Sequence, residues 1–286
     1  MIRTAAWLPA ALLAIAALSA CSKDSPAATR HRFHLPFTKT NDSAGGAIDL
    51  STTSYSPSKL SAVGSVSGTI KLDGPPPPAT IPVPFDQNIC GKTAEAPVSA
   101  TSKGLSNAVV WIADVKTGKD FPIDKRTELS SDNCALNPRV QAVVVGTTVD
   151  VFNDDKLIHR LIFTRMGTND TLTKMPFFNT GQVVASERLA KDAGMVEVRC
   201  VQHPWTRGYI AVFDQPYFAV TDDDGSFTID SLPPGTYKMM VWHEGAANPV
   251  EQQVQVAAGG KAKVDLAIRV GAGRSSPPDS ATGAAR

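Results

Sequence analysis

The sequence predicts an all-β protein. From residue 63 onward, short runs alternate apolar and polar side chains and end at Gly, Pro, Asn or Asp, which is the pattern of strands and turns. No stretch after residue 63 shows the repeat of a long amphipathic helix. The four prolines at 75–78 exclude a paired central strand at that point and indicate an extended connector. Residues 62–270 are enough for one large or two small β domains.

The expected strands fall into two series. The first series covers residues 65–72, 108–113, 139–145, 148–153, 161–163, 195–200 and 209–213. The second series begins near residue 216 and covers residues 218–221, 226–229, 238–242, 253–256 and 263–268. We therefore expect one domain over 62–215 and a smaller one over 216–270.

An Asp-Asp-Asp-Gly turn at 222–225 separates the first two strands of the second series. Glycine supplies the positive φ of a tight hairpin, which this pattern predicts. A calcium loop is the other interpretation, but an EF-hand would need an acid at Val220 and a glutamate at Ser231. The order D-x-x-G-x-F, followed by Leu-Pro-Pro-Gly-x-Tyr at 232–237, resembles the carboxypeptidase regulatory-like β-sandwich. This resemblance implies a small Ig-like or transthyretin-like sandwich over 216–270, a fold to which sugar binding is sometimes attributed.

Residues 1–20 have the plan of a secretory signal peptide. Arg3 supplies a positive charge, and the Ala/Leu-rich run at 5–17 is too short for a bilayer core that needs about 20 apolar residues. The run ends in Leu-Ser-Ala-Cys, which resembles the bacterial lipobox. The resemblance implies a lipid anchor on Cys21 that holds the protein in the cell envelope, at the outer membrane facing the periplasm. The other interpretation is ordinary cleavage beside an incidental cysteine.

Two segments of low apolar periodicity flank the expected domains. Residues 21–61 are rich in Ser, Thr, Ala and Pro, and residues 271–286 are similar, so both are predicted to be disordered, the first as a tether to the membrane. The net charge of +1 shows no basic excess, and nucleic acid is therefore not an expected partner.

The cysteines indicate one disulfide and one thiol with a separate role. With Cys21 lipidated, Cys90, Cys134 and Cys200 remain in an oxidising compartment, where only one pair can form. Cys200 has a histidine three residues later, whereas Cys90 and Cys134 have none close in sequence. We therefore expect a Cys90–Cys134 disulfide and an unpaired Cys200.

Three residues offer the ligand set of a type-1 copper site, which needs two imidazoles and one thiolate in a near-trigonal plane. His159 follows the strand expected at 148–153, and Cys200 ends a strand about forty residues later, with His203 in the next loop. The Cys-x-x-His spacing lets the loop fold back, so that sulfur and imidazole reach one ion. The other interpretation makes His159 a surface residue, Cys200 a buried free thiol and His203 an ordinary loop residue.

The order N-x-D-x(3)-H and then C-x-x-H-P-W resembles plastocyanin-like cupredoxins. The same order is even more similar to that of a family of exported proteins in which a plastocyanin-like domain is joined to the regulatory-like sandwich. The resemblance implies a Greek-key β-sandwich that holds one copper ion through His159, Cys200 and His203. A methionine commonly stands three residues after the second histidine as a weak axial ligand, but here that position is Thr206. We expect the axial side to be open or filled by water, the Thr206 hydroxyl or a backbone carbonyl.

The sequence favours a protein that is not an enzyme, since no nucleophilic triad, pair of catalytic carboxylates in context or Gly-rich phosphate loop is visible. A cupredoxin domain without a second metal cluster carries one-electron chemistry. The first hypothesis is therefore a membrane-anchored copper protein for electron transfer or copper binding, with a redox protein as partner. The second is a non-enzymatic binding module for a cell-envelope glycan or a partner protein, with a degenerate copper site.

Overall fold

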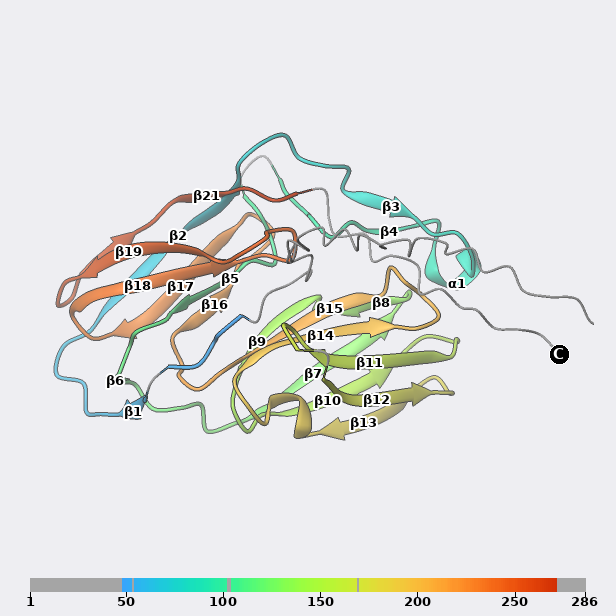
Figure 1. Ribbon diagram of the computed structural model, residues 1–286, viewed down its shortest axis with the longest axis horizontal. Helices are drawn as coiled ribbons and strands as arrows, with labels where there is room; N and C mark the ends of the chain where they lie inside the picture. The colour runs from blue at the N-terminus through green and yellow to red at the C-terminus, as the bar shows by residue number, and fades with distance from the viewer. Residues whose placement is uncertain (1–47, 53, 102–103, 169, 272–286) are drawn as a thin grey trace, which may run out of the picture. The chain divides into compact units, whose positions relative to one another are not determined.

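The computed structural model of the protein describes residues 48–271, except residues 53, 102–103 and 169. The predicted signal peptide, Cys21 and most of the expected tether and tail lie outside the described residues. The described chain forms two β-sandwiches (Figure 1), so the prediction of an all-β fold with two sandwiches is confirmed. Within the described part, no helix has the length and apolar composition that crossing a membrane requires.

One sandwich consists of nine consecutive strands, and we call it the inserted sandwich. Its first sheet contains, in spatial order, β13 (Gln182–Ser186), β10 (Thr148–Asn153), β7 (Arg126–Asp132) and β8 (Ala135–Asn137). Its second sheet contains β12 (Thr171–Phe177), β11 (His159–Arg165), β14 (Gly194–Cys200), β15 (Arg207–Phe213) and β9 (Val140–Val144). The 3-10 helix η1 (Arg188–Ala190) lies between β13 and β14.

The core of the inserted sandwich explains the alternation in its strands. Leu161 and Phe163 of β11, and Val196, Val198 and Cys200 of β14, are buried in one apolar cluster between the two sheets. These residues are two apart along each strand, so they share a face. Burying that face provides the main driving force for pairing the strands in this register.

The other sandwich, which we call the host sandwich, combines strands from both ends of the described chain. One sheet contains β16 (Phe218–Val220), β5 (Val109–Ile112), β18 (Gly235–Trp242) and β19 (Val250–Val256). The other contains β17 (Ser226–Leu232), β2 (Gly64–Leu72) and β20 (Lys261–Lys263), and β21 (Leu266–Ile268) also pairs with β2. Short pairs join β1 (Ser56–Pro57) to β6 (Thr117–Gly118) and β3 (Thr80–Pro82) to β4 (Thr93–Glu95), with helix α1 (Gln87–Cys90) between the latter two.

The sheets divide the chain differently from the expected boundaries at 62–215 and 216–270. β2 pairs with β17, and β5 pairs with β16 and β18, so both early strands complete the host sandwich. Figure 1 shows them among the strands from the C-terminal half. The inserted sandwich therefore lies in the chain between β5 and β16. Alternation identifies a strand but not its partner, which is why the sequence assigned β2 and β5 to the wrong sandwich.

The turn at 222–225 forms as expected, but the strands beside it do not form a hairpin. Gly225 has φ 78° and its N–H donates to the Asp222 carbonyl at 2.8 Å. The strand before the turn pairs with β5, whereas the strand after it pairs with β2 in the opposite sheet. The turn therefore connects the two layers of the host sandwich.

Residues 48–61 correct the expectation of a disordered tether that continues to residue 61. Leu50 is buried in an apolar cluster with residues of both sandwiches. The N–H of Thr52 donates to the carboxylate of Asp214 at 2.9 Å, and β1 lies within this segment. The composition is poor in apolar residues, but Leu50 and Tyr55 both pack against apolar clusters of the sandwiches.

Candidate metal centre

The strand register brings the three predicted ligands together. β11 runs antiparallel to β14, with Leu161 directly opposite Cys200. His159 is two residues before Leu161 and therefore lies on the same face of the sheet, next to Cys200. The loop after β14 then folds back, because the Cys200 N–H donates to the Thr206 carbonyl at 3.0 Å and the Thr206 N–H donates to the His203 carbonyl at 2.9 Å.

The ligand atoms form a nearly equilateral triangle. The Sγ of Cys200 lies 3.5 Å from Nδ1 of His159 and 3.6 Å from Nδ1 of His203, and the two Nδ1 atoms are 3.2 Å apart. A point equidistant from the three atoms is about 2.0 Å from each, close to the roughly 2.0–2.3 Å of zinc–imidazole and zinc–thiolate bonds. All three side chains are buried. The triangle therefore has the size that a bound transition metal ion needs.

Each histidine has a carboxylate on its other ring nitrogen. Nε2 of His159 lies 2.8 Å from Oδ2 of Asp155, and Nε2 of His203 lies 3.3 Å from Oδ2 of Asp86. A proton held on Nε2 by a carboxylate leaves the Nδ1 lone pair directed at the centre of the triangle. Asp155 belongs to the N-x-D-x(3)-H motif, whereas Asp86 is 117 residues from His203 and no sequence pattern indicated it.

Asp155 is held in place by further hydrogen bonds. It accepts from the hydroxyl of Ser131 at 2.8 Å and from the N–H of Cys134 at 3.1 Å. Burial raises the pKa of Asp155, but the hydrogen bonds from His159, Ser131 and Cys134 outweigh it, and the pKa is lowered. Asp155 is therefore an ionised acceptor that fixes the ring of His159.

The metal-free site favours a thiolate beside an imidazolium. Burial raises the pKa of Cys200, but hydrogen bonds from His159 and His203 outweigh burial and lower it to about 5. Burial lowers the pKa of His159, but its contacts with Asp155 and Cys200 outweigh burial and raise it to about 9. The thiolate is the form of cysteine that binds metals, so the protein environment prepares Cys200 for that role.

The structure gives Thr206 a different role from the axial position considered for it. Its buried hydroxyl donates to the carbonyl of Cys134. This hydrogen bond connects the loop after β14, which we call the ligand loop, to the turn between β7 and β8. Another side chain lies beside the thiolate: Oε1 of Gln202 is 3.6 Å from Sγ of Cys200. Gln202 is therefore a neighbour of the three candidate ligands that no sequence pattern indicated.

The expected disulfide is present next to the site. Cys90 and Cys134 are bridged with a Cα–Cα distance of 4.9 Å, and Cys200 is free and buried. The sulfur atoms of the bridge and a ring nitrogen of His203 lie within 4.8 Å of one another. The disulfide therefore belongs to the immediate surroundings of the ligand set.

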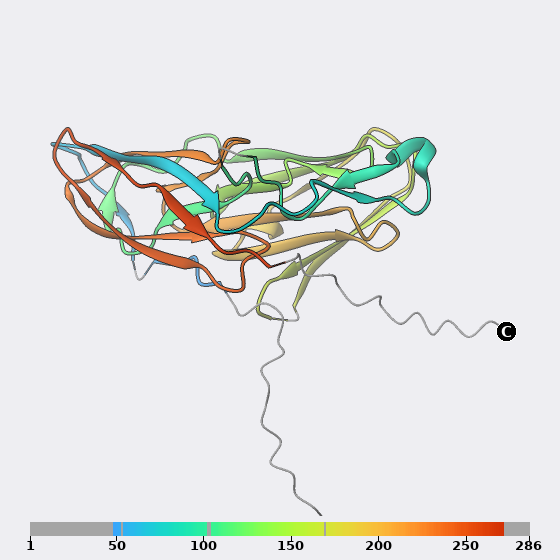
Figure 2. The ribbon, with the colours of Figure 1, turned by 90° about the horizontal axis from the view of Figure 1, so that it is seen from above.

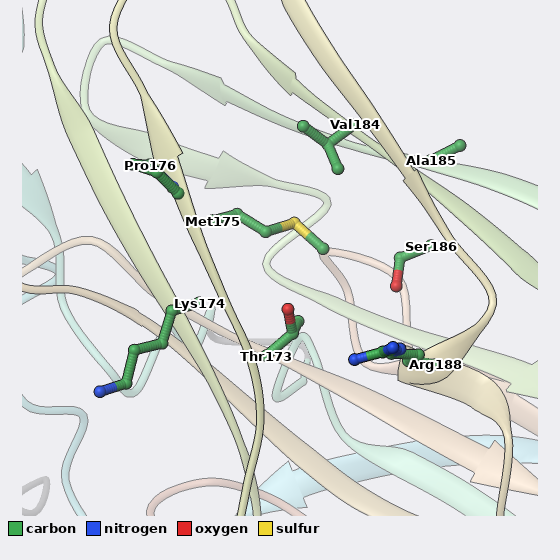
Figure 3. Close-up of a pocket in the computed structure, with 8 residues that line it drawn as sticks. All are labelled: Thr173, Lys174, Met175, Pro176, Val184, Ala185, Ser186 and Arg188. Atoms are coloured by element: carbon green, nitrogen blue, oxygen red, sulfur yellow. The ribbon is translucent and has the colours of Figure 1, made fainter.

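Two tryptophans of the described residues are not placed to stack on a sugar. Trp205 and Trp242 are both buried, so neither offers an exposed face for stacking on a sugar. A pocket of about 280 Å³ opens between β12, β13 and η1, and Figure 3 shows Met175 and Arg188 among its lining residues. None of the lining residues is aromatic, and none belongs to the ligand set.

Comparison with known proteins gives one family match and several structural likenesses. Residues 208–269 match the family model of the carboxypeptidase regulatory-like domain, and no curated protein matches the chain. A structure of a reduced amicyanin mutant has 22% identity and covers 32% of this chain and 85% of its own, with a TM-score of 0.27. A purple cupredoxin from Nitrosopumilus maritimus has 21% identity and covers 30% of this chain and 98% of its own, with a TM-score of 0.25.

A copper-containing nitrite reductase from Thermus scotoductus is also similar, at 19% identity and a TM-score of 0.28. This likeness covers 37% of the chain studied and 25% of the reductase, so the chain spans about a quarter of that enzyme's length. Residues 208–269 thus match the carboxypeptidase regulatory-like domain, and about a third of the chain is similar to cupredoxin structures.

Proposed function

We propose that the protein is an exported copper protein of cupredoxin type, which binds one copper ion and transfers single electrons or carries copper. The observation that supports this proposal best is the buried triangle of two Nδ1 atoms and one Sγ atom from His159, His203 and Cys200. Two imidazoles and a thiolate in a plane are the donor set of blue-copper sites.

The donor set favours copper over structural zinc. Structural zinc sites have four protein ligands in a tetrahedron. Among the described residues, no fourth His, Cys, Asp or Glu side chain joins His159, Cys200 and His203 within one group of neighbouring ligand atoms. When bound, copper would supply one-electron chemistry. The residues themselves hold three donors in place and keep water away from them.

Copper titration of the purified protein tests the proposal. We expect the wild type to bind one copper per chain and to develop an intense visible band from thiolate-to-copper charge transfer. Cys200→Ser should lose this band, because a hydroxyl cannot replace the thiolate. Cyclic voltammetry should show a reversible one-electron couple in the wild type only.

A matched control removes histidines outside the proposed site. The variant His31→Ala/His34→Ala should keep both the stoichiometry and the band, since these residues belong to the N-terminal segment. Uptake of copper without a visible band, or a band that survives in Cys200→Ser, would contradict the proposed ligand set.

We also propose that the protein is anchored to the cell envelope through lipid on Cys21, with a redox protein as its partner. The lipobox-like sequence before Cys21 supports this part of the proposal. Cells fed a labelled fatty acid should yield labelled wild type in the membrane fraction and unlabelled Cys21→Ala. Equal labelling of both proteins, or of neither, counts against the anchor.

A further inference from the structure

A segment between two strands of the host sandwich covers the metal centre of the inserted sandwich. The segment comprises residues 83–92, which we call the cap, and it contains α1. Figures 1 and 2 show β3, α1 and β4 extending away from β2. We propose that the cap completes the metal centre, with Asp86 as the positioning residue for His203. This inference rests on the proposed function, because it concerns the same site.

The cap contacts His203 directly. Oδ2 of Asp86 lies 3.3 Å from Nε2 of His203, the ring nitrogen that faces away from Cys200. The ring of Phe85 lies 5.0 Å from that of Trp205 in an edge-to-face arrangement and 6.1 Å from the ring of His203. His203 is a loop residue, yet it is only 2% exposed. The cap therefore contributes to its burial.

The backbone of Asp86 is arranged to direct its carboxylate at His203. Asp86 is the N-cap residue of α1, and its carbonyl accepts hydrogen bonds from the N–H groups of Ile89 and Cys90. Aspartate at this position normally caps the helix with its side chain, but here the side chain makes no such bond. Asp86 also has φ 54°, in the left-handed region that non-glycine residues rarely adopt. An unusual conformation that turns a carboxylate from its ordinary partner towards a ligand histidine points to a role at the site.

The disulfide ties the cap to both ligand-bearing segments. Cys90 ends α1 and is bridged to Cys134. The N–H of Cys134 donates to Asp155, which holds His159, and the carbonyl of Cys134 accepts from the Thr206 hydroxyl in the ligand loop. The cap also closes on itself, because the Val83 N–H donates to the Lys92 carbonyl at 3.0 Å. The cap is thus positioned as a unit on the site.

The two histidines differ in how their positions are secured. His159 is oriented by Asp155, which lies within the inserted sandwich and has three hydrogen-bond donors. His203 is oriented by Asp86, which comes from outside that sandwich and is half-exposed. Partners on the second ring nitrogen fix the tautomer and orientation of a ligand histidine, and removing one typically costs 10–100-fold in metal affinity. Loss of Asp86 should therefore affect the copper site through His203.

The test compares Asp86→Gly and Asp86→Asn with the wild type. Glycine and asparagine both tolerate the left-handed backbone, so the fold should be retained. We expect Asp86→Gly to weaken copper affinity by about tenfold and to shift the visible band and the reduction potential. Asp86→Asn keeps an acceptor oxygen and should restore most of the affinity. Asp73→Ala, which removes an exposed carboxylate paired with Arg269, should match the wild type.

A second measurement applies to the metal-free protein and separates this inference from the proposed function. ¹⁵N–¹H spectra of the imidazoles should show the Nε2–H of His203 hydrogen-bonded and protected from exchange with water in the wild type, and this protection should be lost in Asp86→Gly. Absence of copper uptake by the wild type would count against the proposed function alone. An identical Nε2–H signal of His203 in the wild type and Asp86→Gly, together with identical affinity and band position wherever copper is bound, would overturn the role of Asp86.

Discussion

Removing the Cys90–Cys134 disulfide should lower the free energy of unfolding by about 4 kcal/mol in the chain-entropy estimate for a bridge between residues 44 apart. The physical reason is that the bridge restricts the unfolded chain, whose entropy rises once it is gone. Cys90→Ala, Cys134→Ala and the double variant should lose nearly the same amount, because any of them removes the whole bridge. Urea denaturation of the copper-free protein, without added reductant so that the bridge of the wild type stays intact, measures these losses.

Cys200→Ala is the matched control, since it removes a buried thiol but no bridge. It should lose distinctly less stability than the other variants. If the double variant loses twice as much stability as each single variant, the two cysteines contribute through independent contacts and not through a disulfide. The outcome also bears on the cap, because Cys90 and Cys134 hold it beside His203.

Arg139→Met should destabilise the fold by about 3–5 kcal/mol, because it leaves the buried carboxylate of Glu244 without its partner. Nε and Nη2 of Arg139 donate to the two carboxylate oxygens of Glu244 at 2.6 and 3.0 Å. The side chains are only 10% and 2% exposed, and the pair joins the residue before β9 to the second residue after β18. It therefore links the inserted sandwich to the host sandwich, beside the packed rings of Tyr209 and Trp242.

The loss of folding stability in Arg139→Met should depend on pH. Burial already raises the pKa of Glu244, although Arg139 opposes this, and removing the arginine should raise it further. A folded-state pKa above the unfolded value means that stability is retained at low pH and lost as pH rises through the folded-state pKa. Unfolding at pH 5 and pH 8 should show the larger loss at pH 8. The double variant Arg139→Met/Glu244→Leu should recover much of it, and a double variant that stays as unstable as Arg139→Met would contradict this account.

Local patterns in the sequence were informative where chemistry depends on residue type and short spacing. The Cys-x-x-His spacing indicated Cys200 and His203, and the structure places both within 3.6 Å of each other and within 3.5 Å of His159. The cysteine count indicated the Cys90–Cys134 bridge, which is present. Both inferences needed only the identity of a few side chains and the number of cysteines available for pairing.

Thr206 and Asp86 have roles that such local patterns do not predict. Thr206 was considered for the axial position because it stands where a methionine is common, but its hydroxyl is directed at the carbonyl of Cys134, 72 residues away. Asp86 lies 117 residues before His203 and belongs to a segment with no metal motif. Their roles depend on which distant segments are packed together, and residue type alone does not encode this.

The sequence by itself determined the all-β class, the three residues of the candidate metal centre and the pairing of the cysteines, because alternation, spacing and residue chemistry are local properties of the chain. Only the tertiary structure decided that β2 and β5 complete the host sandwich, and that a cap from that part of the chain covers His203. Strand pairing and burial are selected by the free energy of the whole packed molecule, in which residues more than one hundred positions apart become neighbours. A strand such as β2 has the same alternating pattern whichever sheet it joins, so its place is decided by the surface left for it to cover.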